Sequence, residues 1–182
     1  YSPNGVNMDL FRPIGKREAK KKLNLDPGKR SLLFVSSNYL ERPEKRYDRF
    51  MATFDILKSK YNKLDIEPLL LINEKRERVP LYFNASDIHL LTSDIEGSPN
   101  SVKESLACNT PVVSTNVGNV VDLLSNVKNC CISYNKSPEE LAEYCSFVLT
   151  NSENVYLKER IIELRLDMGS VAERITQVYK SM

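Results

Sequence analysis

Residues 87–114 read DIHLLTSDIEGSPNSVKESLACNTPVVS, and this stretch contains one complete strand–helix–strand unit. The apolar run at 87–91 predicts a buried strand, and the polar residues 92–97 predict a loop. Residues 99–108 predict a helix, and the run at 111–114 predicts a second buried strand. Continuously apolar strands that alternate with helices are typical of a parallel sheet with both faces covered.

The same alternation extends to both sides of this unit. It predicts further strands at residues 32–35, 66–72 and 130–133. It predicts helices at residues 47–60, 79–85, 117–124 and 137–149, and two more near 155–164 and 170–181. The sequence therefore predicts an α/β fold, a doubly wound parallel sheet with helices on both faces. Ligands of such sheets bind at the carboxyl ends of the strands, at a switch point in the strand order.

Length and composition predict one folded domain over residues 1–182. A chain of 182 residues can bury a substantial core, and its 41% apolar content is typical of globular proteins. No apolar run approaches the ~18 residues of a membrane helix. The chain begins without Met or a signal-peptide pattern, so we expect a piece of a longer protein. We expect residues 1–13 to be an interdomain linker outside the core, and residues 150–182 to form the C-terminal helices.

Basic residues are concentrated in the first third of the chain, although the net charge is only +2. Such a region can attract phosphate groups, acidic lipid or nucleic acid. The alternative for the run Lys16–Lys22 is a solvated helix face. No recognition motif of interleaved aromatic and basic residues supports nucleic-acid binding, so we predict no nucleic-acid partner. Peripheral contact with an anionic membrane surface stays open.

The cysteines and the single histidine do not form a recognisable metal-binding pattern. The chain has Cys108, Cys130, Cys131 and Cys145, without a C-x-x-C pair, and one histidine, His89. This excludes an ordinary Cys/His zinc site, and we predict no metal. We expect the cysteines to be small buried residues in a reducing compartment, which indicates a cytoplasmic protein. His89 lies in an apolar strand pattern, so we expect a core or an edge histidine.

A candidate phosphate site lies where the predicted loop at 92–97 enters the next helix. Ser98 is a favourable N-cap residue and Pro99 a favourable first helical residue. The backbone N–H groups of Asn100 and Ser101 are then among the unpaired donors of the first turn. Together with the helix dipole, they predict a site for a phosphate group.

Two carboxylates flank this candidate phosphate site. Glu96 precedes the helix, and Glu104 lies one to two turns into it at ~1.5 Å per residue. One carboxylate can accept two hydroxyl hydrogen bonds, which suits the diols of a sugar or a ribose. The arrangement predicts a nucleotide-diphosphate sugar as ligand. The alternative for each residue alone is a solvated surface carboxylate.

Five segments in the same order give the chain a resemblance to glycosyltransferase family 4, the glycosyl transferases group 1 of the GT-B fold. The first is the E-x7-E pair within EGSPNSVKESLACNTPVVSTNVG, residues 96–118. The others are SPNGVN with FRP at residues 2–7 and 11–13, LLFV at 32–35, RPEKR at 42–46, and VPLYFNASD at 79–87. The resemblance spans nearly the whole chain and implies one Rossmann-like half of a GT-B fold, the C-terminal donor-binding domain.

The resemblance also implies roles for the matching residues. Glu96 matches the residue that contacts the donor sugar hydroxyls, and Lys45 matches the lysine that neutralises the diphosphate. Both are the candidate catalytic residues. Glu104 matches the residue that holds the nucleotide ribose. The remaining candidate donor-binding residues at the loop and helix start are Gly97, Ser98, Asn100 and Ser101.

The sequence departs from the family pattern in two regions. The family usually has Gly-Arg-Leu after the first strand, whereas this chain has Ser36-Ser37-Asn38. Arg42 is the first candidate to replace that arginine at the donor, because it precedes Lys45 by three residues, and Arg46 is the alternative. Residues 73–78 occupy the region in which the family usually recognises the base. Because they differ from the family pattern there, the identity of the nucleotide base stays open.

The resemblance further implies that the full-length parent is a retaining hexosyltransferase that needs no metal or other cofactor. Its expected partners are the nucleotide-sugar donor and an N-terminal domain, absent from this chain, that holds the acceptor. We expect the isolated domain to bind donor without transferring sugar. The acceptor class is open: a sugar, a lipid or a protein. The alternative function is a non-catalytic α/β module for nucleotide binding or protein interaction.

Overall fold

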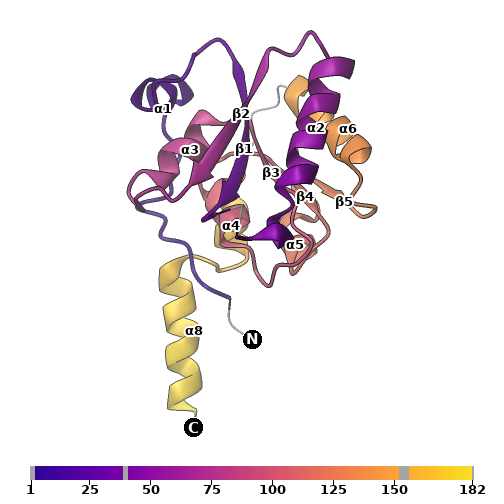
Figure 1. Cartoon of the computed structure of the whole chain (residues 1–182). Helices are drawn as coiled ribbons and strands as arrows, with labels where there is room; N and C mark the ends of the chain where they lie inside the picture. Colours follow the sequence, from indigo (N-terminus) through magenta and orange to yellow (C-terminus); the bar gives the residue numbers. More distant parts are fainter. Residues whose placement is uncertain (1–2, 39–40, 152–155, 182) are drawn as a thin grey trace.

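The computed structural model describes residues 3–38, 41–151 and 156–181. They form one parallel sheet with helices around it (Figure 1). The sheet has five strands in the order β2-β1-β3-β4-β5. Their bounds are β1 (Arg30–Ser36), β2 (Ile66–Ile72), β3 (Ile88–Leu91), β4 (Val112–Thr115) and β5 (Cys131–Ser133). All four strand pairings are parallel, as the apolar strand pattern predicted.

The strand order reverses direction at β1. The chain moves from β1 to β2 on one side and then crosses back to β3 on the other side. The β1–β2 register runs from Arg30 opposite Ile66 to Ser36 opposite Ile72. The β1–β3 register is shorter and includes Leu32 opposite Ile88. The junction of β1 and β3 is therefore the switch point, where doubly wound sheets bind ligands.

One face of the sheet is covered by α2 (Tyr47–Lys60) and α6 (Pro138–Thr150). Ser137 caps α6, because its side chain accepts a hydrogen bond from the Glu140 backbone N–H. The buried side chains on this face come from the strands and from both helices. They include Leu32, Phe34, Phe50, Leu57, Leu90 and Leu141.

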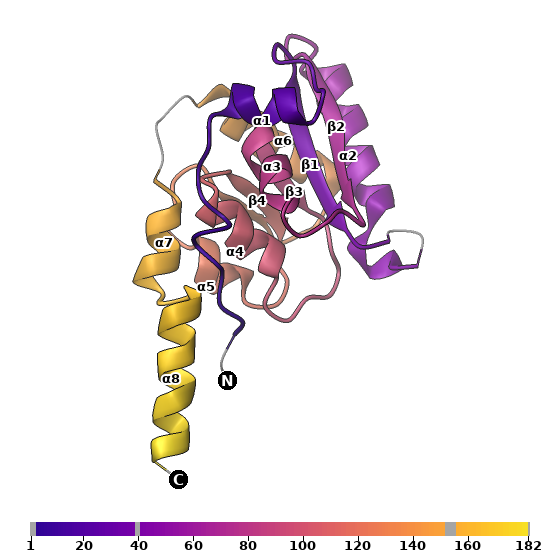
Figure 2. The same ribbon diagram turned by 90° about the vertical axis from the view of Figure 1, so that its left-hand side faces the viewer.

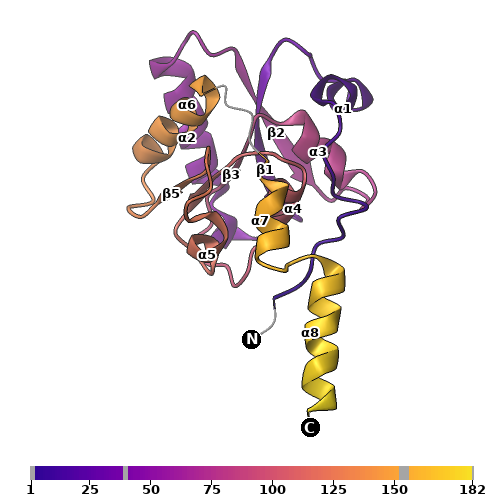
Figure 3. The same cartoon turned by 180° about the vertical axis from the view of Figure 1, so that it is seen from behind.

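The opposite face carries the remaining helices of the domain body, as Figures 2 and 3 show. These are α1 (Lys16–Lys22), α3 (Val79–Ala85), α4 (Asn100–Ala107), α5 (Val120–Leu124) and α7 (Lys158–Glu163). The buried side chains on this face include Leu33, Phe83, Leu91, Leu106, Leu123 and Ile161. The predicted doubly wound α/β fold with helices on both faces is confirmed.

The N-terminal segment packs against the domain and against the start of α8 (Met168–Lys180), a helix that extends away from the body (Figure 1). The Val6 N–H donates to the Leu166 carbonyl at 2.8 Å, and the Met168 N–H donates to the Val6 carbonyl at 3.0 Å. Val6 and Phe11 are both buried in the core. The expectation that residues 1–13 lie outside the core was wrong for these two, because their apolar side chains gain by burial.

Most predicted elements have nearly the predicted bounds. The strand at 66–72 and the helices at 47–60 and 79–85 agree at both ends. The helix predicted at 117–124 begins at Val120, because Gly118 adopts a left-handed φ of 52°. The helix predicted from residue 155 begins at Lys158, and its first predicted residue lies outside the described residues.

The Lys16–Lys22 run forms helix α1, but its side chains are not all solvated. Lys20 is buried, and its ammonium group donates to the Lys29 carbonyl. The reading of the run as a solvated face was therefore wrong for Lys20. A buried ammonium needs such a partner, since leaving it unpaired is costly. Lys20 is also unavailable to an anionic surface.

No helix within residues 3–38, 41–151 and 156–181 combines the length and the apolar character that crossing a membrane requires.

Truncating a buried side chain on either face of the sheet is expected to destabilise the fold to a similar extent. Leu57 on α2 and Leu106 on α4 are fully buried on opposite faces of the sheet. Replacing either by Ala is expected to lower the free energy of unfolding by about 2–5 kcal/mol, through lost burial and a residual cavity. Urea denaturation measures the effect. The control Ile162→Ala, at an exposed position, is expected to change stability by less than about 0.5 kcal/mol. Equal stability of Leu57→Ala and wild type would contradict the assigned core.

Candidate functional site

Loops that follow β1 and β3 meet at the carboxyl edge of the sheet. The β1–α2 loop contains a short 3-10 helix, η1 (Pro43–Lys45), which touches the loop after β3. The Thr92 hydroxyl donates to the Lys45 carbonyl at 2.9 Å, and the Asp94 N–H donates to the Glu44 carbonyl at 2.8 Å. These bonds hold the two loops together at the switch point.

The contact between the loops places Lys45 beside Glu96. The Lys45 ammonium donates to Glu96 Oε1 at 2.6 Å, and the Ser93 hydroxyl donates to the same oxygen at 2.8 Å. Both charged side chains are 14% exposed, so solvent screens this pair less than it screens a surface pair. The two predicted catalytic residues, 51 positions apart in sequence, are therefore direct neighbours.

Asp94 fastens the same loop to helix α2. Its carboxylate accepts hydrogen bonds from Arg46 and Arg49, each at 2.8 Å. Burial raises the pKa of Asp94, but the hydrogen bonds from both arginines outweigh it and lower this pKa below its usual range. Arg49 also donates to the Thr92 carbonyl at 2.6 Å. These contacts give Asp94 a structural role in joining the loop to the helix.

Arg42 and Arg46, the candidates for the missing phosphate-loop arginine, are both engaged elsewhere. Arg42 Nε donates to Glu44 Oε1 at 2.7 Å, and its side chain is half exposed. Arg46 pairs with Asp48 and Asp94 at 2.8 Å. In this structure neither arginine joins the Lys45–Glu96 pair, and a donor role for Arg42 stays a prediction.

A third loop, between β4 and α5, closes against the residue that follows Glu96. The Asn119 N–H donates to the Gly97 carbonyl at 3.0 Å. Gly118 lies so close that a Cβ there would stand 2.2 Å from the Gly97 oxygen and 2.8 Å from the Glu96 oxygen. Gly97 itself has open space around its Cβ position. Gly118 is therefore required for close packing of the two loops.

The helix start lies in this loop cluster, one residue later than predicted. Helix α4 begins at Asn100, and its N-cap is Pro99, in an extended conformation. Ser98 was predicted as the N-cap, and that prediction was wrong: its hydroxyl is buried without a partner among the described residues. The extended Pro99 moves Ser98 out of reach of the first turn. Helix geometry still leaves the Asn100 and Ser101 amides without intrahelical acceptors.

Glu104 lies in the interior of α4 and contacts an arginine that sequence reasoning had not singled out. Arg76 donates to Glu104 Oε1 at 2.6 Å, although the two residues are 28 positions apart. The Glu104 side chain is only 9% exposed. Burial raises the pKa of Glu104 above its usual range, and the Arg76 hydrogen bond and charge oppose this shift without cancelling it. The carboxylate therefore has one charged partner from the loop between β2 and α3.

His89 lies in the core of the sheet, as expected. It is fully buried in β3, and neither ring nitrogen has a partner among the described residues. Burial, and secondarily the charge of Lys45, lower the pKa of His89 to about 3. The ring is therefore neutral near neutral pH, and it packs edge-on against Phe83 in the core.

The predicted site residues thus fall into two groups. Lys45, Glu96 and Gly97 lie in the joined loops, directly before the start of α4 at Asn100 and Ser101. Glu104 lies further along the same helix. Sequence reasoning missed Ser93 and Arg76. The polar run at residues 73–78 was a signal for Arg76, but nothing local to that run indicates a bond to Glu104.

The side chains that could bind a metal ion do not cluster in the described part of the chain. Within it, no three side chains of His, Cys, Asp or Glu gather closely enough to hold an ion.

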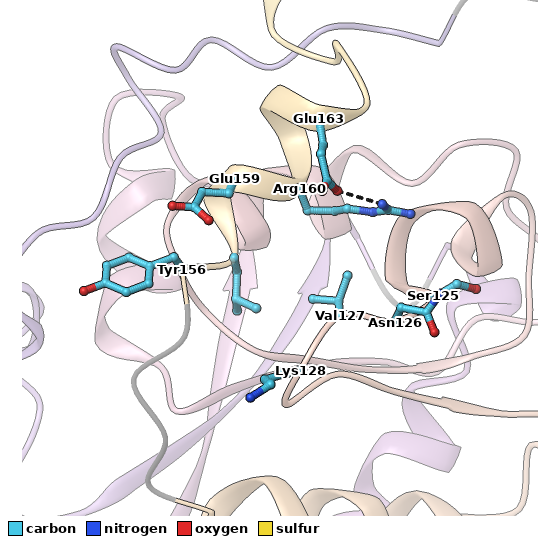
Figure 4. Close-up of a pocket in the computed structure, with 9 residues that line it drawn as sticks. Ser125, Asn126, Val127, Lys128, Tyr156, Glu159, Arg160 and Glu163 are labelled. Atoms are coloured by element: carbon cyan, nitrogen blue, oxygen red, sulfur yellow. Dashed lines mark hydrogen bonds and ion pairs between the residues drawn. The ribbon is translucent and has the colours of Figure 1, made fainter.

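A separate pocket of about 530 Å³ lies between α7 and the segment after α5 (Figure 4). Its lining includes Lys128, Tyr156, Arg160 and Glu163. The Arg160 guanidinium pairs with Glu163 at 2.8 Å and donates to the Asp122 carbonyl at 2.8 Å, so it fastens α7 to α5. This pocket contains none of the predicted site residues. The charged side chains that meet at the switch point are therefore the stronger candidate for the functional site.

The strand order, the helices on both faces and the loops at the switch point define a Rossmann-like α/β domain. Its residues 67–172 match the family described as Glycosyl transferases group 1. The chain belongs to this family. No curated protein gives a significant sequence match.

Solved structures share the fold at low sequence identity. Sucrose-phosphate synthase from Thermosynechococcus elongatus is 19% identical with a TM-score of 0.78, over 98% of this chain and 51% of that one. HepE from Anabaena, in complex with UDP-glucose, is 16% identical with a TM-score of 0.77, over 100% and 57%. The C-terminal domain of a group 1 glycosyl transferase, LpcC from Francisella tularensis, is 16% identical with a TM-score of 0.67, over 94% and 98%.

These similarities establish the fold as the Rossmann-like half of a GT-B glycosyltransferase. The chain spans about half the length of sucrose-phosphate synthase and of HepE, and nearly the whole LpcC domain.

The close approach at Gly118 predicts a specific intolerance. Gly118→Ala is expected to lower the free energy of unfolding by more than about 1 kcal/mol, because it adds a left-handed penalty to a clash with the Gly97 loop. The control Gly15→Ala places a Cβ no closer than 3.9 Å to its neighbours. Urea denaturation of both variants tests this, and equal stability would show that the loops are not packed as described.

Proposed function

We propose that this chain is the donor-binding half of a retaining hexosyltransferase, and that a nucleoside-diphosphate sugar binds where the loops after β1 and β3 meet. The Lys45–Glu96 pair beside the start of α4 is the observation that carries the proposal. It supplies a cation, a hydroxyl acceptor and unpaired backbone donors at the switch point, where ligands of doubly wound sheets bind.

In this proposal Lys45 and the start of α4 bind the diphosphate. The Lys45 ammonium has three donors, and its bond to Glu96 uses one of them. The amides of Asn100 and Ser101 and the positive end of the helix dipole add to the attraction for phosphate oxygens. Lys45 also stabilises the negative charge that develops on the leaving diphosphate. These groups neutralise the charge without a metal ion.

Glu96 and Glu104 bind hydroxyl groups at different parts of the donor. Glu96 lies beside Lys45, where it accepts hydroxyls of the sugar once the diphosphate draws the lysine toward itself. Glu104 lies along α4 from the phosphate site and accepts the ribose hydroxyls. The order sugar, diphosphate, ribose along the joined loops and α4 matches the order of these groups in the donor.

The acceptor side belongs to a further domain in this proposal. The half-length coverage of sucrose-phosphate synthase and HepE supports an N-terminal partner domain that holds the acceptor. The isolated chain then binds donor but transfers no sugar. The cysteines are free, which supports a reducing, cytoplasmic compartment.

Nucleotide binding tests the proposed function directly. UDP, GDP, ADP and their hexose derivatives are each added to the chain, and the free energy of unfolding is measured by urea denaturation. The matching nucleotide, at a hundred times its dissociation constant, is expected to add about 2.7 kcal/mol to the free energy of unfolding. The same sample is expected to transfer no hexose to simple sugar acceptors. Failure of every nucleotide to bind would reject donor binding and favour the non-catalytic interaction module, and hexose transfer would reject the need for a second domain.

Two isosteric variants separate the proposed carboxylate roles. Glu104→Gln is expected to weaken the nucleoside diphosphate and the intact sugar nucleotide alike, because ribose is common to both. Glu96→Gln is expected to weaken only the sugar nucleotide. Each loss is about tenfold, the size of one charge-assisted hydrogen bond. Isothermal titration calorimetry measures both ligands. Glu173→Gln, in an exposed pair with Arg165, is the control. Wild-type affinities for both variants would refute the assigned roles.

A further inference from the structure

Arg76 connects the N-terminal segment of the chain to the interior of α4. Its guanidinium lies over the Phe11 ring, 4.5 Å from the ring centroid, and also donates to Glu104 Oε1 at 2.6 Å. Phe11 is buried and packs edge-on against Phe83 of α3. The Arg76 side chain is 56% exposed, yet these two contacts fix its charged end from two directions.

Glu104 needs such a partner because of where it lies. A carboxylate that is 9% exposed loses most of its hydration, and burial accordingly raises its pKa. The Arg76 hydrogen bond and charge act in the opposite direction. A protonated Glu104 would accept hydroxyl hydrogen bonds less well than the carboxylate does.

Lys103 also acts on Glu104, and Glu104 in turn acts on the Cys108 thiol. Lys103 lowers the pKa of Glu104 through its charge, but its ammonium is directed to the Asn4 carbonyl, to which it donates at 2.8 Å. Burial raises the pKa of the Cys108 thiol to about 12, so Cys108 is neutral. Arg76 is thus the group that combines charge with a direct bond to the carboxylate.

The bond to Arg76 is compatible with a ligand on Glu104. A carboxylate offers about four lone-pair sites on its two oxygens, and the Arg76 bond uses one of them. A planar guanidinium suits this task, since it stacks on an aromatic face while it donates in its own plane. A lysine would keep the charge but lose the planar stacking.

We propose that Arg76, held by the Phe11 ring, is a positioning residue that keeps Glu104 fixed as a charged hydrogen-bond acceptor for the nucleoside hydroxyls. The nucleoside part of this inference rests on the proposed function. The N-terminal segment thereby takes part in the donor site through Phe11, although this segment precedes the first strand of the sheet.

The test compares Arg76→Gln, Arg76→Lys and Phe11→Leu in the full chain. The control is Arg165→Gln, which removes an arginine of similar exposure, 64%, from an ion pair of the same length, 2.6 Å. The titration of the Glu104 carboxyl carbon is followed by NMR without nucleotide, and Glu104→Gln identifies the signal. The dissociation constant of the tightest-binding nucleoside diphosphate is measured across the acidic to neutral pH range, and thermal unfolding confirms that each variant is folded.

We expect Arg76→Gln to move the Glu104 titration to higher pH and to weaken the nucleotide about tenfold on the acidic side, with a smaller loss where Glu104 is ionised. Arg76→Lys and Phe11→Leu are expected to give smaller shifts in the same direction, and Arg165→Gln none. The double variant Arg76→Gln with Glu104→Gln is expected to bind nucleotide no more weakly than Glu104→Gln alone.

Three outcomes would overturn the inference. An unchanged Glu104 titration in Arg76→Gln would remove the positioning role. An equal loss of affinity at every pH, without a shift of the titration, would mean that Arg76 contacts the nucleotide itself. A wild-type titration in Phe11→Leu would remove Phe11 from the arrangement. If wild type binds no nucleotide, the proposed function fails, while the NMR titration still decides whether Arg76 acts on Glu104.

Discussion

The reversal of strand order between β1 and β3 is the constraint on which the candidate site depends. The chain leaves β1 for α2 on one face of the sheet and leaves β3 for α4 on the other face. The two strands are neighbours, so their loops begin side by side even though they lead to opposite faces. Lys45 of one loop therefore contacts Glu96 of the other. Backbone and hydroxyl bonds between the loops then maintain the contact, and Gly118 allows the third loop to close against them.

Buried charge imposes a second constraint, and it ties the N-terminal segment to the site. Lys103 and Glu104 are both buried on α4, and an unpaired charge there would be costly. Lys103 is satisfied by the Asn4 carbonyl, and Glu104 by Arg76, which lies on the Phe11 ring. The segment that precedes the first strand is therefore part of the domain in energetic terms. Its position bears on the helix that the proposed donor would contact.

Much of the fold could be predicted, because its signals are local. The apolar runs at 66–72 and 111–114 predict buried strands without knowledge of their neighbours, and strands form at Ile66–Ile72 and Val112–Thr115. The errors occurred where the backbone conformation or a tertiary contact overrode a local rule. Ser98 is a favourable cap residue, but the extended Pro99 starts the helix later. Lys20 belongs to a basic run, yet the Lys29 carbonyl holds it in the interior. Phe11 lies in a segment that was predicted to be a linker, and its packing on Phe83 shows it to be core.

Periodicity and spacing along the chain are enough to predict the alternation of strands and helices, the parallel sheet, the helix start near Asn100 and the candidate pair Glu96 and Glu104. The pairing of charges is visible only in the folded chain: Lys45 contacts Glu96, Arg42 pairs with Glu44, and Arg76 reaches Glu104. The reason is physical: which charges pair depends on strand order and on loops that meet in space. Lys45 and Glu96 are 51 positions apart in sequence, and Arg76 and Glu104 are 28 positions apart, so no local pattern records that meeting.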